Sequence, residues 1–94
     1  MQNIAVFART NVGATLALDK LLENIPEQYI VSKTISYDGT TKVVLRGDTV
    51  YQTVLANDRV RGKSFDVAYV EKSVDMEIVY QIIAPCVTGY IGFI

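Results

Sequence analysis

The sequence contains no histidine and no tryptophan, and it has a single cysteine, Cys86, among its 94 residues. Without histidine, the chain lacks the most frequent general base and the commonest metal ligand of proteins. A Ser-His or Cys-His nucleophilic pair within this chain is therefore excluded. One cysteine cannot form an internal disulfide, which is typical of a protein in a reducing compartment.

An excess of positive charge is also missing, because nine Lys and Arg residues face ten Asp and Glu residues, for a net charge of -1. Binding to nucleic-acid phosphates usually requires such an excess, so we expect no direct contact with nucleic acid. No apolar run approaches the roughly 18 residues of a membrane-spanning helix. The N-terminus lacks the basic and then apolar pattern of a signal peptide. These absences favour a cytoplasmic protein that makes no contact with a membrane.

What the chain does have is apolar residues, which make up half of the sequence. This share is high for a short chain, because small domains bury a modest part of their surface. Either the core is well filled, or some apolar surface meets a partner or the rest of a larger protein, and the composition leaves these interpretations open. The length favours one domain that spans residues 1–94.

The N-terminal third predicts a strand followed by an amphipathic helix. Asn3–Ala8 (NIAVFA) is a short apolar run typical of a buried strand. Thr10 or Asn11 could cap the helix, and Pro26 ends it. The apolar residues that recur at helical spacing are Ala14, Ala17, Leu18, Leu21, Leu22 and Ile25. A strand followed by such a helix is the first half of a βαβ unit.

The middle of the chain predicts an antiparallel meander. Residues 30–36, 41–46 and 48–56 form three short segments rich in β-branched residues and tyrosine. Asp38-Gly39 separates the first two and is a strong signal for a two-residue hairpin loop. Arg46-Gly47-Asp48 separates the second pair. We expect this meander to be inserted between two strands of parallel type.

The chain is organised around residues 61–87, which predict a loop with Arg61-Gly62, then a buried strand, then a helix. The strand is Asp66–Val70, an apolar run typical of a strand covered on both faces. It ends on Glu71-Lys72, at the carboxyl edge where α/β sheets place ligands. A helix is predicted from Ser73 to about Ala84. A last strand over Gly89–Ile94 would leave an exposed edge, which predicts self-association.

Two groups of charged residues are candidate sites. Glu71 follows four apolar residues, as does the acid that holds Mg²⁺ in nucleotide hydrolases, but Lys72 stands where a second acid would polarise water. Arg59 and Arg61 could contact phosphates or a partner. The alternative for these arginines is a solvated loop with acidic neighbours such as Asp66. We predict no catalytic residue and no metal ligand.

The C-terminal residues 59–94 resemble the middle of the ATPase domain of the large terminase subunit, the DNA-packaging motor of tailed phages. In that family an Arg-Gly turn leads into the metal-site strand, and a helix and a Thr-Gly or Ser-Gly turn follow. The counterparts in this chain are Arg61-Gly62, Phe65, Val67–Glu71, Ala84-Pro85 and Thr88-Gly89. Residues 3–29 are similar to the strand and helix that follow the family's nucleotide-binding helix, and the middle resembles its Gly-turned meander.

The chain also departs from the family. The family's phosphate-binding loop and adenine-contacting segment precede the region that matches Asn3, and its coupling motif would follow Ile94. Its metal-binding Asp corresponds to Glu71, and its catalytic Glu corresponds to Lys72. The nuclease domain has no counterpart. The resemblance therefore implies an internal slice of the motor that lacks the phosphate-binding loop.

What the resemblance implies for fold is a small three-layer α/β sheet with flanking helices, of the P-loop NTPase kind, with the meander as an insertion. The family uses ATP and Mg²⁺, and we expect neither to bind to this chain, which we predict to be inactive as an enzyme by itself. The expected function is that of a non-catalytic terminase-like protein or fragment in an infected cell, which associates with itself or with another packaging subunit. The alternatives are a small phage accessory or inhibitor protein that binds a packaging or host component, and an unrelated α/β binding module.

Overall fold

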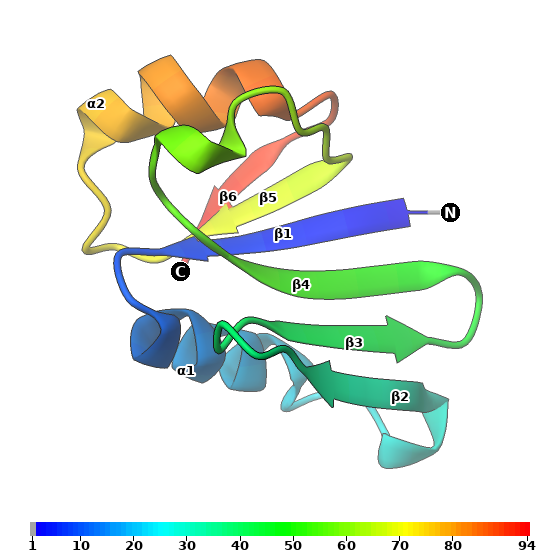
Figure 1. Cartoon of the computed structure of the whole chain (residues 1–94). Helices are drawn as coiled ribbons and strands as arrows, with labels where there is room; N and C mark the ends of the chain where they lie inside the picture. Colours follow the sequence, from blue (N-terminus) through cyan, green and yellow to red (C-terminus); the bar gives the residue numbers. More distant parts are fainter. Residues whose placement is uncertain (1) are drawn as a thin grey trace.

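The computed structural model describes residues 2–94, apart from the Asp58 side chain, and has a six-stranded sheet between two helical layers (Figure 1). The strands are β1 (Gln2–Ala8), β2 (Ile30–Ile35), β3 (Thr41–Leu45), β4 (Thr49–Leu55), β5 (Val67–Val70) and β6 (Ile91–Phe93). The helices are α1 (Asn11–Leu22) and α2 (Met76–Ile78), which continues as a π-helical segment (Val79–Ile83) and a 3-10 turn (Ala84–Cys86). Further 3-10 turns are Glu27–Tyr29 and Asp58–Val60.

The strand order is β2-β3-β4-β1-β5-β6, and the sheet is mixed. Strand β1 lies in the centre and pairs in parallel with both β4 and β5, and β5 pairs in parallel with β6. The pairs β2–β3 and β3–β4 are antiparallel. Four predictions are thereby confirmed. The meander is present, and along the chain it lies between the parallel strands β1 and β5. The fold is of the three-layer α/β class, and the last strand lies at the edge of the sheet.

The two faces of the sheet carry two separate cores, and the alternation of side chains along β1 supplies both. Val6 packs with Leu18 of α1 on one face, and Phe7 packs with Ile83 of the second helical layer on the other. All four side chains are fully buried. A strand covered on both faces must be apolar at consecutive positions, which is why the run from Ile4 to Ala8 is continuously hydrophobic.

Helix α1 begins as the sequence predicts. Thr10 is the N-cap, and its hydroxyl accepts a hydrogen bond of 3.0 Å from the backbone N–H of Gly13. Ala14, Ala17 and Leu18 face the sheet. Val12 and Leu16 remain 72% and 64% exposed, because α1 packs on β1 and β4 and leaves its outer face uncovered. None of the helices within residues 2–94 has the length and hydrophobicity that crossing a membrane requires.

The prediction that the second helix starts at Ser73 is wrong. The cap is Asp75, whose carboxylate accepts a hydrogen bond of 3.0 Å from the backbone N–H of Glu77. The hydroxyl of Ser73 instead donates to the carboxylate of Glu71. An Asp that precedes the first apolar helical residue is as good an N-cap as Ser, so the two positions could not be ranked by residue type.

The prediction of a two-residue hairpin loop at Asp38-Gly39 is also wrong. The backbone N–H of Gly39 donates to the carbonyl of Ser36, and the N–H of Ser36 donates to the carbonyl of Thr40, which gives a three-residue loop over 37–39. Gly39 has a φ of 90°, whereas Asp38 has no positive φ. The Asp38 side chain bonds Thr40 instead, which stabilises a longer loop with glycine in the left-handed position.

The α1-side face of β5 and β6 carries a tyrosine pair beyond the edge of α1. Ala68 and Val70 face the second helical layer, so Tyr69 points to the opposite face. Its hydroxyl lies 2.8 Å from the hydroxyl of Tyr90, and the two rings are nearly perpendicular. The hydrogen bond with Tyr90, together with burial, raises the pKa of Tyr69 to about 12.

We expect this pair to be visible in a pH titration. A pKa raised in the folded state adds stability that is fully present below pH ~10 and is lost as the pH rises toward 12. In the wild type, the ultraviolet phenolate absorbance should include a late phase from Tyr69, beside that of Tyr51, whose pKa is also raised by burial. Tyr90→Phe should lower the pKa of Tyr69 toward 10, whereas Tyr37→Phe, at an exposed position, should leave it unchanged. Identical late phases in the wild type and in Tyr90→Phe would contradict the assignment.

Candidate functional site

The candidate site lies at the carboxyl ends of β1 and β5, which pair in parallel. After β1 the chain turns to α1 on one face of the sheet, and after β5 it turns to α2 on the other face (Figure 1). Where neighbouring parallel strands send their connections to opposite faces, a crevice opens at the sheet edge, and α/β proteins place ligands there. We refer to this place as the switch-point crevice.

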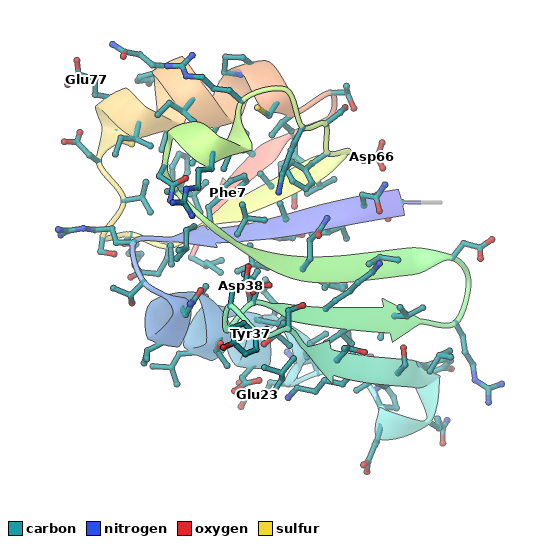
Figure 2. The ribbon with its side chains drawn as sticks, in the orientation of Figure 1. Phe7, Glu23, Tyr37, Asp38, Asp66 and Glu77 are labelled. Carbon is teal, nitrogen blue, oxygen red and sulfur yellow. The ribbon has the colours of Figure 1, made fainter. Side chains whose placement is uncertain are left out.

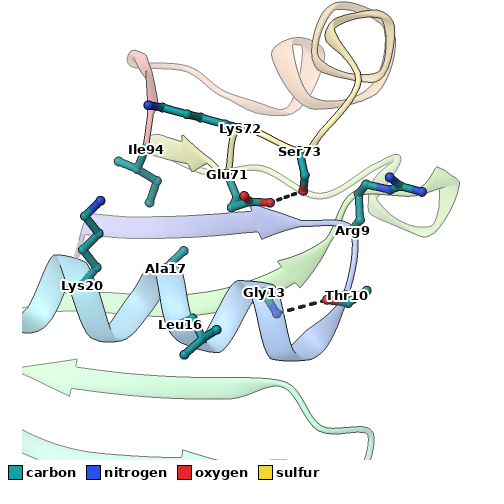
Figure 3. A pocket seen from close by; sticks show the side chains of 10 residues that line it. All are labelled: Arg9, Thr10, Gly13, Leu16, Ala17, Lys20, Glu71, Lys72, Ser73 and Ile94. Carbon is teal, nitrogen blue, oxygen red and sulfur yellow. Dashed lines mark hydrogen bonds between the residues drawn. The ribbon is translucent and has the colours of Figure 1, made fainter.

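Backbone hydrogen bonds fix the residues that follow β5. The N–H of Glu71 donates to the carbonyl of Phe7 at 2.9 Å, which links it to β1. The N–H of Lys72 donates to the carbonyl of Ile94 at 3.0 Å, which links it to the end of β6. The carboxylate of Glu71 accepts a hydrogen bond from the Ser73 hydroxyl (Figure 3). The Glu71-Lys72 pair is therefore held at the point where three strands end.

The switch-point crevice has a volume of about 590 Å³, which falls within the range of small-molecule sites, about 300–1,000 Å³. It lies between α1 and the ends of β5 and β6 (Figure 3). Its polar lining residues are Arg9, Thr10, Lys20, Glu71, Lys72 and Ser73, and its apolar ones are Gly13, Leu16, Ala17 and Ile94. A cavity of this size can accept either a ligand or the side chains of another protein segment.

The charges around the crevice are unequal. Arg9, Lys20 and Lys72 contribute three positive charges, and Glu71 contributes one negative charge, which gives a net charge of +2. The three cations are exposed, so their field is screened by salt over about 10 Å at 0.1 M. Within residues 2–94, no three His, Cys, Asp or Glu side chains gather as metal ligands would. The arrangement therefore favours contact with acidic groups.

The predicted site residues fall in different places. Glu71 and Lys72 lie at the carboxyl edge, as predicted, and both line the switch-point crevice. Arg59 lines a separate depression beside the end of β4. Arg61 lies in a third depression, next to the 3-10 turn that contains Pro85. The structure thus does not bring the two arginines together with Glu71 and Lys72 in one site.

Sequence analysis missed Arg9 and Lys20. Arg9 follows β1 as Glu71 follows β5, so the parallel pairing of the two strands could have indicated that they share one edge. The helical spacing places Lys20 on the solvent side of α1, and it does lie there in part. No local pattern separates a lysine that faces water from one that borders a crevice, because the difference depends on where β6 ends.

Comparisons with known proteins give one kind of match. No protein-family model and no curated protein sequence matches the chain. Among solved structures, the large terminase from a thermophilic bacteriophage superposes with a TM-score of 0.65 over 98% of this chain at 15% sequence identity. A structure of that terminase in complex with ADP gives a TM-score of 0.63 at 14% identity. The chain spans about a quarter (25%) of the length of these structures, and at such low identity the likeness shows the fold.

Proposed function

We propose that the chain is a terminase-like protein, or a fragment of one, that acts in phage DNA packaging and is non-catalytic as it stands. The observation that carries the proposal is the likeness of fold to a large terminase over 98% of this chain. The sequence resemblance runs in the same order along the chain and points to the same family. It assigns Glu71 and Lys72 to the family's metal-binding and catalytic positions.

The chemistry at the switch-point crevice supports the absence of catalysis. Phosphoryl transfer to water needs carboxylates to hold Mg²⁺ and a residue that orients the attacking water. Lys72 is a cation that can do neither, and the Glu71 carboxylate bonds Ser73. The N–H of Gly13, which could face a phosphate at the start of α1, donates to Thr10. The switch-point crevice therefore offers a single carboxylate, that of Glu71, whereas the reaction needs carboxylates for Mg²⁺ and a further residue for the attacking water.

We expect calorimetric titration of the folded chain with ATP and Mg²⁺ to give no saturable heat. The crevice is positive, so weak charge-driven heat can appear at low ionic strength, and it should vanish in about 0.15 M salt, where the Debye length is about 8 Å. Inorganic phosphate is the matched control, because it has charge without the nucleoside. Saturable binding of Mg-ATP at micromolar concentration, in salt and without a phosphate response, would refute the proposal.

A second function is favoured by the exposed apolar side chains. Ten large apolar side chains of the described residues are at least 46% exposed, among them Leu16, Tyr80 and Phe93. Where such side chains form a contiguous patch, the patch often marks a contact with another protein. A chain that reproduces a quarter of a motor's length could act as an accessory or inhibitor by occupying a contact between packaging subunits. Adding it to an assembled packaging reaction should then lower the packaging rate. An unchanged rate at excess chain would remove this alternative.

A further inference from the structure

Two exposed surfaces of the molecule complement each other in charge and in apolar content. The first is the rim of the switch-point crevice, whose lining includes the cations Arg9, Lys20 and Lys72 and the apolar residues Leu16 and Ile94. The second is the outer side of α2 and its continuation, which we call the α2 surface. It consists of Asp75, Met76, Glu77 and Tyr80. The two surfaces lie on opposite faces of the sheet.

The α2 surface is unusual in its combination of residues. Val79 and Ile83 are buried under this segment, whereas Met76 and Tyr80 are 46% and 70% exposed. Glu77 projects away from the sheet (Figure 2), and the Asp75 side chain caps the same helix. The surface thus places an apolar pair next to two carboxylates.

The crevice rim has the opposite character. Leu16 is 64% exposed on α1, and Ile94, which follows β6, is partly buried across the crevice. The rim has a net charge of +2, from three cations and Glu71, whereas the α2 surface has a net charge of -2, from its two carboxylates. The crevice rim therefore combines apolar and positive side chains, and the α2 surface combines apolar and negative ones.

We propose that the α2 surface of one copy of this chain docks into the switch-point crevice of a second copy. Tyr80 and Met76 would contact Leu16 and Ile94, while Glu77 would face Lys20 across the rim. Tyrosine and methionine are enriched in the cores of protein interfaces, and complementary charges fix the register of the contact. This contact does not depend on whether the chain belongs to a packaging motor.

The opposite placement of the two surfaces determines the kind of assembly. The two copies contribute different surfaces to the contact, so the contact is heterologous. After docking, one copy still has a free crevice and the other still has a free α2 surface. Such contacts produce either rings or open chains, not a closed two-fold dimer. Patches of this size bury less than about 1,200 Å², the range of transient complexes. Self-association through the free edge of β6 would instead be a two-fold contact.

Charge reversal on each side provides the test, with sedimentation velocity over a concentration series as the measurement. Lys20→Glu disables the crevice and leaves the α2 surface intact, and Glu77→Lys does the reverse. Each variant alone should associate at least about tenfold more weakly than the wild type. Lys42→Glu and Glu27→Lys are matched controls, because they make the same charge changes at exposed positions outside both surfaces. Circular dichroism establishes that every variant is folded.

Mixing the two variants distinguishes the head-to-tail contact from other kinds. In the mixture, the unchanged Glu77 of the Lys20→Glu variant faces the unchanged Lys20 of the Glu77→Lys variant. At the next contact, the lysine introduced at position 77 faces the glutamate introduced at position 20, so opposite charges meet again. The mixture should therefore associate about as strongly as the wild type, although neither variant does so alone, and the mixed controls should associate no better than either control alone. The proposal is overturned if the wild type stays monomeric at high concentration, if either variant alone associates like the wild type, or if the mixture associates no better than the separate variants.

Discussion

Replacement of Phe7 by alanine is expected to lower the free energy of unfolding by about 3–5 kcal/mol, the usual cost of removing a buried phenylalanine side chain. Phe7 lies in the central strand β1 and is fully buried. Its ring meets that of Phe65 edge to face, with the centroids 5.8 Å apart. The substitution would leave a cavity under the second helical layer, in the core that also contains Ile83.

The loss should be large compared with the total stability. Domains of this size are stable by about 5–15 kcal/mol, so Phe7→Ala should shift the urea midpoint strongly or leave the chain partly unfolded. Circular dichroism is the suitable probe, because the sequence has no tryptophan. Phe93→Ala is the control: it removes the same atoms at a position that is 51% exposed and should cost much less. Equal losses for the two variants would mean that Phe7 does not occupy the core.

The fold could be predicted from the sequence because its strongest signals are local. The continuous apolar run of β1, the helical spacing of Ala14, Ala17 and Leu18, and the β-branched segments of the meander each specify one element. Their order then specifies the sheet, since a strand followed by a helix returns to a parallel neighbour. The positions that failed were boundaries, such as the cap of α2 and the length of the first hairpin loop, where residues of equal propensity compete.

Of the four charged residues at the candidate site, two could be predicted from the sequence and two could not. Glu71 and Lys72 follow a strand directly, so their place at the carboxyl edge could be inferred from the chain around them. Arg9 and Lys20 come from another strand and from a helix, and they join the crevice through the pairing of β1 with β5 and the position of α1. The local spacing of residues in the sequence does not reveal side chains that are brought together only by tertiary contacts. The same holds for the α2 surface, which depends on which side of the helix the sheet covers.

Gly89→Ala is expected to have the second large effect, and it tests how the crevice is built. A Cβ at this position would overlap the backbone carbonyl oxygen of Asp66. That carbonyl cannot move aside easily, because the adjoining strands are joined by the bonds from the Ala68 N–H to the Tyr90 carbonyl and from the Thr88 N–H to the Phe65 carbonyl. We expect a loss of about 1–3 kcal/mol, the range for an overpacked site, together with displacement of β6 from β5.

Hydrogen exchange would separate this displacement from a general loss of stability. The amide of Lys72 bonds the carbonyl of Ile94, so moving β6 should expose it and open the crevice at the same time. Gly47→Ala is the control, because Gly47 has a φ of 87° and no atom within 4 Å of its added Cβ; it should cost about 1–2 kcal/mol from backbone strain alone. If Gly89→Ala left the exchange of Ala68 and Lys72 as slow as Gly47→Ala does, β6 would not depend on this close approach, and Ile94 would not be held at the crevice by the sheet.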